Sequence, residues 1–395
     1  MARAAHLSLR SPAKRSPRRP GASADAGEQR PPDGGKGRGA RSNISGRYEK
    51  ETRERVDDGW QAATPEFDGA GEDASLAPPL KTDVTIEKPK KIITFNKSPY
   101  VGFDRSINPY RGCEHGCIYC FARPTHAYMG LSPGLDFESR LFAKPSAAAL
   151  LEKELSNPRY APRVVAMGTN TDPYQPIERK FRIMRGVLET FSRFNHPVTV
   201  LTKSHLITRD IDILASLAAR NLTRAMVSIT TLDKSLARAM EPRASSPEKR
   251  FDAVKALSEA GVPTGIMTAP LIPGLNDDEL ETLLERAKVA GADFVGYTII
   301  RLPLEVSPLF QEWLETYAPA RSARIMRHIR DMDGGRDYDV HWSRGKEIKA
   351  AYAKLLSQRF KKAVDRLGFA QDKPPLDLSR FRAPAEASSQ MSLFD

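Results

Sequence analysis

The chain has 395 residues, with 28% charged and 40% hydrophobic side chains and a formal net charge of +12. This length allows one large domain or two smaller ones with a sizeable core. No apolar run approaches the length of a membrane span, and the N-terminus lacks the apolar stretch of a secretory signal, so we expect a cytoplasmic protein.

The first 85 residues are predicted to form a disordered tail because they are polar and rich in proline and glycine. Residues 1–50 carry 12 Lys/Arg against 4 Asp/Glu, and residues 51–80 carry 2 against 8, so residues 81–395 hold a net +10. The arginine-rich start faintly resembles a transit peptide, although its acidic residues count against this. The basic remainder favours an acidic partner such as nucleic acid.

A barrel domain is predicted over residues 86–305, where short apolar runs alternate with amphipathic stretches. The predicted strands are 106–110, 163–168, 197–202, 224–230, 264–269 and 294–300, and the predicted helices are 147–155, 177–194, 209–219, 247–260 and 277–289. Ser246 before Pro247 is a helix-start signal, and Gly261 and Gly291 are stop signals. The alternation predicts an α/β fold with parallel strands and outer helices. Six units, where eight close a full barrel, predict an open, partial TIM-like (β/α)6 barrel.

All three cysteines of the chain, Cys113, Cys117 and Cys120, lie within eight positions after the first predicted strand. An odd number in one short loop is not a self-contained disulfide set, so they are predicted to be metal ligands. Soft thiolates select zinc, copper(I) or iron–sulfur clusters. A cubane cluster takes four cysteines, so three leave one iron open for a small molecule. Gly112 and Gly116 suit a loop that bends closely around such a cluster.

Zinc is the alternative occupant of this loop. His126 follows Cys120 by five further residues, and His115 lies between the first two cysteines. Either histidine would complete a closed Cys3His structural zinc site. The spacing of the cysteines alone leaves both metals open.

Polar residues follow the predicted strands at their carboxyl ends, where parallel β/α folds build active sites. The second strand leads into a small polar cluster with Thr169, the third ends at Lys203, and the fourth contains Ser228 and is followed by Arg243. Lys203 is placed to meet a carboxylate or phosphate. Each residue also has a plainer interpretation as part of a turn, a helix cap or the solvated surface.

A helical extension is predicted over residues 306–370, with helices at 322–332 and 346–367, followed by a flexible tail at 371–395. The tail ends in Gln390-Met391-Ser392-Leu393-Phe394, which resembles the Gln-x-x-Leu-Phe peptide by which bacterial DNA repair and replication proteins dock on the sliding clamp. Leu393 and Phe394 would be its apolar anchors and Gln390 its hydrogen-bonding group.

The three-cysteine loop, with Tyr119 directly before its last cysteine, resembles the signature of radical S-adenosylmethionine (radical SAM) enzymes. Over about residues 95–300 the chain is similar to their spore photoproduct lyase-like, or DNA repair photolyase-like, branch. The resemblance implies that the cysteines bind a [4Fe-4S] cluster whose open iron is chelated by S-adenosylmethionine, which is cleaved to a 5′-deoxyadenosyl radical. It further implies that cofactor contacts are made by Tyr119, Thr169, Lys203, Ser228 and Arg243.

Spore photoproduct lyases carry a further cysteine at the end of the second strand, where this chain has Gly168. Tyr174 and Tyr128 are alternative hydrogen donors, although such tyrosines are just as often packed aromatics. We therefore expect a lyase- or repair-like radical SAM enzyme that acts on DNA or another nucleic acid and takes electrons from a reductant such as flavodoxin or ferredoxin. The alternatives are an RNA, protein or metabolite substrate, or a non-catalytic zinc module that binds nucleic acid.

Overall fold

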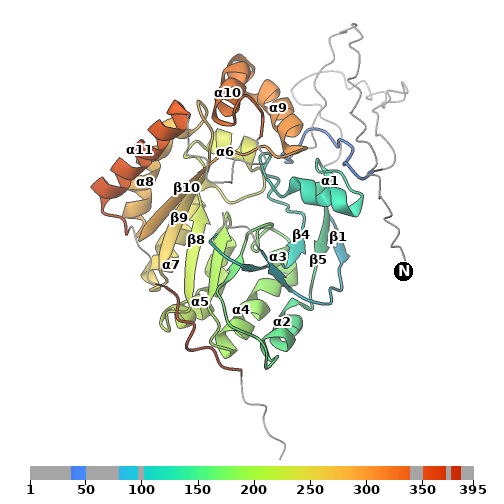
Figure 1. Ribbon diagram of the computed structural model, residues 1–395, viewed down its shortest axis with the longest axis vertical. Coiled ribbons are helices and arrows are strands. Elements are labelled where there is room, and N and C mark those ends of the chain that lie inside the picture. The colour runs from blue at the N-terminus through green and yellow to red at the C-terminus, as the bar shows by residue number, and fades with distance from the viewer. Residues whose placement is uncertain (1–36, 50–79, 97–101, 339–349, 371–374, 384–395) are drawn as a thin grey trace, which may run out of the picture. The chain divides into compact units, whose positions relative to one another are not determined.

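The computed structural model (Figure 1) describes residues 37–49, 80–96, 102–338, 350–370 and 375–383. Its largest element is a seven-stranded sheet in the order β10-β9-β8-β7-β6-β3-β2. Neighbours from β3 to β10 are parallel, and β2 pairs antiparallel with β3. The strands are β2 (Ile93–Phe95), β3 (Arg105–Ile107), β6 (Val165–Met167), β7 (Val198–Thr202), β8 (Thr223–Ser228), β9 (Thr264–Leu271) and β10 (Phe294–Ile299). Six parallel strands confirm the predicted open, partial barrel.

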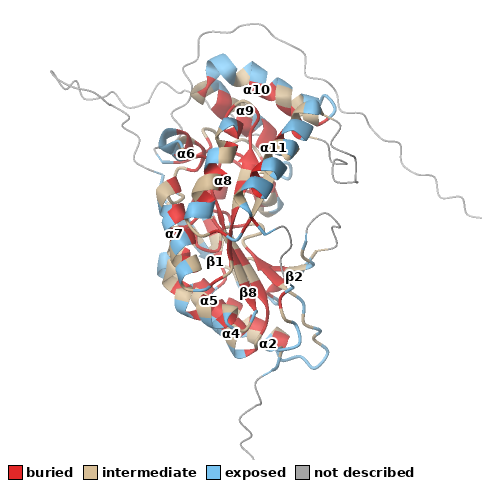
Figure 2. Cartoon of the chain, turned by 90° about the vertical axis from the view of Figure 1, so that its left-hand side faces the viewer, coloured by how far each residue is buried: buried red, intermediate tan, exposed pale blue. Residues whose placement is uncertain are grey.

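Helices cover the outer face of this sheet and turn their exposed residues toward solvent (Figure 2). They are α2 (Ala147–Leu155), α3 (Glu178–Phe181), α4 (Ile183–Arg193), α5 (Ile211–Ala218), α7 (Pro247–Glu259) and α8 (Leu280–Val289), with the 3-10 helices η2 (His205–Asp210) and η3 (Asp277–Glu279). The core lies between the two layers, where Val187 and Phe191 of α4 share one buried cluster with Val200, Val227 and Ile266 of the strands. Each such side chain contributes about 1.5–3 kcal/mol on burial.

The predicted helix over residues 177–194 is two helices. Arg182 adopts a left-handed conformation with φ of 50° and separates α3 from α4. The side chain of Glu178 accepts a hydrogen bond from the Met184 amide at 3.1 Å, so it satisfies a free donor at the start of α4. Apolar residues recur at helical spacing on both sides of the break, so the sequence pattern does not reveal it.

A second, three-stranded sheet was not predicted. It has the order β1-β5-β4, with β1 (Asp83–Ile86), β5 (Arg140–Ala143) and β4 (Tyr110–Arg111). The segment between the first and second parallel strands, β3 and β6, contains β4 and β5 together with the 3-10 helix η1 (Arg123–Met129) and the short helix α1 (Asp136–Ser139). The strand β1 precedes β3 in the chain. Each strand has at most four residues, too few for a clear alternation.

Residues 37–49, here called the strap, correct the prediction of a disordered tail through residue 85. Arg38 is 8% exposed and Ala40 is fully buried, and the strap hydrogen-bonds to residues about a hundred positions later. Its local composition is polar and glycine-rich, so only contacts with distant residues order it.

After residue 305 the described chain forms α9 (Val306–Tyr317), α10 (Pro319–Met332) and α11 (Ala351–Leu367). The helix α9, like α6 (Lys234–Met240), was not predicted. Residues 375–383 correct the expected flexible tail over 371–395, because Phe381 packs against Tyr160, Phe194 and His196. Gln390, Leu393 and Phe394 lie outside the described residues, so clamp binding stays a prediction. No described helix has the length and apolarity needed to cross a bilayer.

Candidate active site

The cysteine loop follows β3 and β4 at the carboxyl end of the parallel sheet, as predicted. Two backbone hydrogen bonds close its turns: the Gly116 amide donates to the Cys113 carbonyl, and the Cys120 amide donates to the Cys117 carbonyl, both at 3.2 Å. Gly112 and Gly116 have φ of +70° and +67°, which confirms the predicted need for glycine. A Cβ on Gly112 would also lie 2.8 Å from the Phe137 carbonyl oxygen.

The side chain of Arg123, which sequence analysis missed, hydrogen-bonds to the backbone of this loop. This side chain is fully buried, and every guanidinium N–H is used. Nε donates to the Cys117 carbonyl at 2.9 Å, and Nη2 donates to the Gly116 carbonyl at 3.0 Å and to the Glu138 carboxylate at 2.5 Å. Nη1 donates to two carbonyls of the following turn, at residues 133 and 134, both at 3.0 Å. One planar group therefore fixes two carbonyls of the cysteine loop.

Glu138 joins the strap to the same arrangement. Its carboxylate is fully buried and accepts the amides of Gly39 and Ala40, both at 2.8 Å, in addition to Arg123. A Cβ on Gly39 would overlap the Gly116 carbonyl, so the strap touches the cysteine loop itself. No local sequence signal points to this contact.

The three thiols fit a cationic metal centre. Cys113 and Cys117 are buried and Cys120 is partly buried, and burial raises the pKa of each thiol. Buried thiols become thiolates most readily when a metal offsets their charge. No three described His, Cys, Asp or Glu side chains converge as they would on a single metal ion. A cubane cluster does not require this convergence, because its cysteines bind different iron atoms.

The two histidines proposed as zinc ligands have other partners. His126 Nε2 lies 2.9 Å from the Arg140 carbonyl oxygen, and burial lowers its pKa to about 4. His115 Nδ1 lies 3.3 Å from the Asp172 carboxylate. These contacts favour the cluster over a closed zinc site.

Asp172, in the turn after β6, links the cysteine loop to the end of β7. Its carboxylate accepts the Thr202 hydroxyl at 2.6 Å and the Lys203 amide at 2.7 Å, and it faces His115. Burial would raise the pKa of Asp172, but these partners, His115 foremost, lower it to about 2. The turn therefore keeps a negative charge beside Cys113, where sequence analysis saw only a polar turn.

Tyr119 and Lys203 are brought together, as expected of neighbours in one site. The Lys203 ammonium lies 5.9 Å from the centre of the Tyr119 ring. The Tyr119 hydroxyl donates to Glu241, which also pairs with the buried Arg250. Burial would raise the pKa of Glu241, but Arg250 and then Lys203 lower it to about 2. The hydrogen bond from the Tyr119 hydroxyl to Glu241 thus fixes the orientation of the Tyr119 ring.

The other predicted cofactor contacts lie at the same strand ends. Ser228 is buried, and its hydroxyl donates to the Ala269 carbonyl at 3.4 Å. Thr169 is partly buried in the turn that starts at Gly168. The Arg243 guanidinium forms an ion pair of 3.0 Å with Glu114, so in this structure a carboxylate of the cysteine loop holds it.

The predicted hydrogen donors lie in different surroundings. Tyr174 is fully buried, and its hydroxyl donates to Asp210 at 3.1 Å, a contact that packs the turn after β6 against η2. Tyr128, on η1, is 69% exposed and stacks on Tyr48 of the strap. Gly168 has φ of +84°, and a Cβ there would overlap the Leu201 carbonyl, so the backbone leaves no space for a cysteine.

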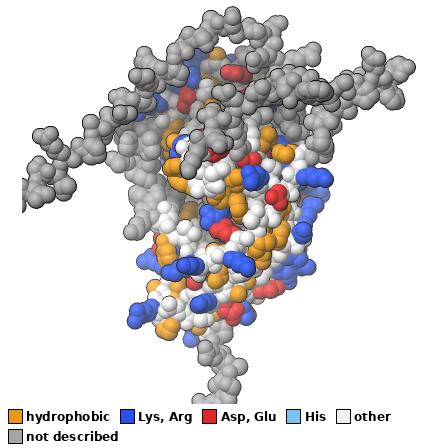
Figure 3. All heavy atoms as spheres, turned by 90° about the vertical axis from the view of Figure 1, so that its right-hand side faces the viewer, with side chains coloured by type: hydrophobic (Ala, Val, Ile, Leu, Met, Phe, Trp, Pro, Cys, Tyr) orange, Lys and Arg blue, Asp and Glu red, His pale blue; other side chains and the backbone are white. Residues whose placement is uncertain are grey.

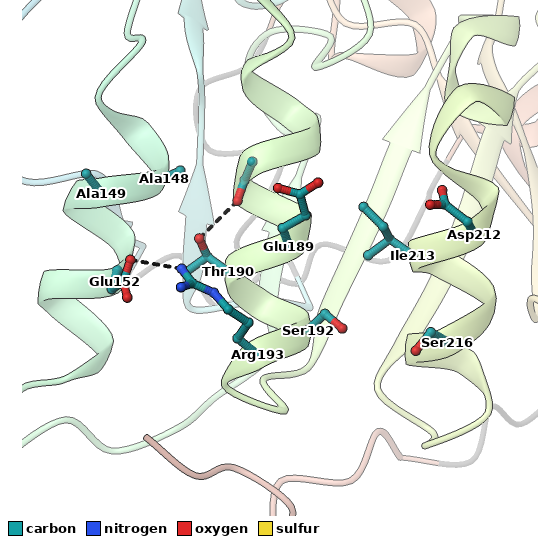
Figure 4. Close-up of a pocket in the computed structure, with 11 residues that line it drawn as sticks. Ala148, Ala149, Glu152, Glu189, Thr190, Ser192, Arg193, Asp212, Ile213 and Ser216 are labelled. Atoms are coloured by element: carbon teal, nitrogen blue, oxygen red, sulfur yellow. Dashed lines mark hydrogen bonds and ion pairs between the residues drawn. The ribbon is translucent and has the colours of Figure 1, made fainter. Parts of the chain in front are cut away.

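A hollow on the outer helical layer lies between α2, α4 and α5 (Figure 4). Its lining contains no cysteine or histidine, and Arg193 and Glu152 form an ion pair of 2.9 Å along it. Its helices cover the outer face of the sheet, whereas the cysteine loop lies at the strand ends. The hollow is therefore separate from the candidate active site.

Comparisons with known proteins agree with this geometry. Residues 107–287 match the sequence profile described as "Radical SAM superfamily". An uncharacterized protein of Mycobacterium tuberculosis is 31% identical over 325 residues, 81% of this chain and 91% of its own length. A protein of Pseudomonas phage M6 named "Radical SAM Nalpha-GlyT isomerase" is 25% identical over 219 residues, 54% of this chain and 43% of its own. A structure of spore photoproduct lyase complexed with dinucleoside spore photoproduct covers 72% of this chain and 79% of its own at 15% identity, with a TM-score of 0.50, so the fold is shared.

Proposed function

We propose that this chain, which belongs to the radical SAM superfamily whose enzymes use a [4Fe-4S] cluster and S-adenosylmethionine, performs radical chemistry on a base of DNA or another nucleic acid. The observation that carries the proposal is the cysteine loop, held by the buried Arg123 at the strand ends and flanked by Tyr119 and Lys203. When bound, the cluster and S-adenosylmethionine supply a 5′-deoxyadenosyl radical that removes a hydrogen atom from the substrate.

The roles of this chain's residues follow from their positions. Cys113, Cys117 and Cys120 hold the cluster, while Arg123 holds the carbonyls between them. Lys203 offers an ammonium to the carboxylate of S-adenosylmethionine, since its head lies beside the Tyr119 ring. The Tyr119 ring, fixed by Glu241, offers an apolar face to the adenine. Three further polar residues at the same strand ends complete the cofactor site: Thr169, Ser228 and Arg243.

The reaction differs from that of spore photoproduct lyase in its hydrogen donor. Gly168 has no thiol, and the backbone around it excludes a Cβ. The returning hydrogen comes instead from a tyrosine or from the cleaved cofactor itself. Of the two predicted tyrosines, the exposed Tyr128 is open to substrate, whereas Tyr174 is buried on Asp210.

Charge supports a nucleic-acid substrate. The chain carries +12, and Lys and Arg side chains are spread over the described part of one face (Figure 3). A basic surface raises the local concentration of a polyanion and speeds its association. Spore photoproduct lyase, which shares this fold, has been solved in complex with a dinucleoside spore photoproduct.

The test is anaerobic reconstitution with iron and sulfide, followed by reduction with S-adenosylmethionine and chromatography for 5′-deoxyadenosine. We expect the wild type to release 5′-deoxyadenosine and Cys117→Ala to release none. With an added deuterated oligonucleotide, we expect the wild type to transfer deuterium into the 5′-deoxyadenosine. A fully loaded cluster that releases no 5′-deoxyadenosine would contradict the radical reaction. Release without any change in DNA or RNA would contradict the substrate class.

A further inference from the structure

Two tyrosines, one on the strap and one on η1, form an exposed stacked pair. Tyr48 of the strap and Tyr128 of η1 have ring centroids 5.2 Å apart and ring planes 28° apart. Tyr48 is 58% exposed and Tyr128 is 69% exposed, so more than half of each side chain meets solvent. The Arg47 guanidinium lies 5.5 Å from one ring centre and 5.8 Å from the other. We call Arg47, Tyr48 and Tyr128 the aromatic platform.

The backbone below the platform is fixed. Gly46 approaches η1 so closely that a Cβ there would lie 3.2 Å from the Ala127 Cβ. Asn43 and Asp136 exchange two hydrogen bonds, of 3.0 and 3.1 Å, which tie the strap to α1. Arg47 also pairs with Glu305 at 2.9 Å. A rigid support of this kind lowers the entropy lost when a ligand stacks on the rings.

The platform lies at the catalytic end of the barrel. The helix η1 begins three residues after Cys120, and five further residues of 3-10 helix carry Tyr128 about 10 Å beyond Arg123. The strap reaches the platform directly from its contact with Glu138 beneath the cysteine loop. Phe121, which follows the last cysteine, is itself 61% exposed. Exposed aromatic rings therefore extend outward from the cysteine loop.

We propose that the aromatic platform stacks an unpaired base of a nucleic acid next to the base that reacts, an inference that rests on the proposed function. Stacking on exposed aromatic rings is how proteins bind single-stranded nucleic acid without sequence preference. Arg47 adds a cation within reach of the adjoining phosphate or base. The exposed side chain of Arg47 supports this choice of partner, because it places a positive charge near both rings. A neutral metabolite would gain little from this charge, whereas each nucleotide of a nucleic acid carries a phosphate that it can meet.

Fluorescence anisotropy with a labelled single-stranded dT oligonucleotide tests the platform in the full-length, reconstituted protein. We expect Tyr128→Ala and Tyr48→Ala each to weaken binding by roughly 5- to 150-fold, the range of one base–aromatic stack. Tyr128→Phe keeps the ring and is expected to bind like the wild type. Phe95→Ala is the matched control, because Phe95 is 62% exposed under Arg105 at the opposite, amino end of β3.

The outcomes separate the platform from the proposed function. Suppose that the wild type binds the oligonucleotide and that both alanine variants bind it equally well at unchanged melting temperatures. The platform is then wrong, while the proposed substrate class stands. If wild type binds neither single-stranded nor double-stranded DNA or RNA, both the platform and the proposed substrate class are wrong. Equal loss in Tyr128→Phe and Tyr128→Ala would show that the hydroxyl acts and not the stacking face, and would also overturn the proposal.

Discussion

Replacing Arg123 by methionine tests whether one buried side chain holds the cysteine loop. The variant removes one donor from each of four carbonyl oxygens, of which that of Cys117 keeps the Cys120 amide, and it leaves the Glu138 carboxylate buried with two backbone amides. Removing one partner of a buried ion pair costs about 3–5 kcal/mol. Each buried carbonyl left unsatisfied costs about 1–3 kcal/mol, less where water enters. Since such terms are not additive, we expect a total on the order of 5 kcal/mol, concentrated in the loop.

Hydrogen exchange by mass spectrometry on the cluster-free, full-length protein measures this loss directly. We expect residues 113–121 to lose protection, the melting temperature to fall, and less iron to be retained on reconstitution. Arg193→Met is the matched control, because its ion pair with Glu152 is about half exposed and contributes little. Adding Glu138→Gln to Arg123→Met is expected to restore part of the stability, since it removes the uncompensated charge. Arg123→Met that melts and exchanges like wild type would refute the reasoning.

Three further predictions concern the cofactor, the missing thiol and pH. Lys203→Met is expected to weaken S-adenosylmethionine binding at unchanged iron content, and equal affinity in anaerobic calorimetry would contradict its role. Gly168→Cys is expected to lower the melting temperature, because its Cβ overlaps the Leu201 carbonyl, and a variant as stable as wild type would contradict this clash. Burial lowers the pKa of His126 and His196 to about 4, so the unfolded chain binds protons first and stability falls as pH drops from about 6.5 toward 4. At pH 5 the loss is on the order of 2 kcal/mol per histidine. Melting curves should show a weaker pH dependence in His196→Gln, and an unchanged one would argue against the assignment.

The barrel was predictable because its signals are local. The three residues of β6 are all buried and read as an apolar run, and the start of α7 has its cap, Ser246, directly before a proline. The features that the hydrophobic pattern missed depend on side-chain contacts between residues. The break at Arg182 depends on Glu178 reaching the Met184 amide, and no residue at the break announces it. The periodicity of apolar residues therefore predicted the strands and helices of the barrel but not the break within a helix.

The cysteine loop was predictable for a similar reason, because all three cysteines lie in one short stretch. The groups that hold the loop were not. The Gly39 amide bonds to Glu138 across 99 positions, and the strap has no apolar pattern that would mark it as ordered. Tyr119 was identified from its place before Cys120, but its partner Glu241 lies 122 positions away. Sequence spacing identifies candidate ligands, whereas the contacts that surround them depend on the fold.

The ion pair between Arg123 and Glu138 is better explained by geometry than by stability. Burying both charges carries a desolvation cost that apolar side chains of similar size would avoid, often with equal or greater stability. Apolar contacts, however, have no direction. The guanidinium donates in one plane to Gly116 and Cys117, so it sets the orientation of the peptide groups on which the middle cysteine is mounted. The carboxylate then fixes that plane and ties it to the strap. A loop that must present thiols in one arrangement before any metal arrives gains from such directional contacts.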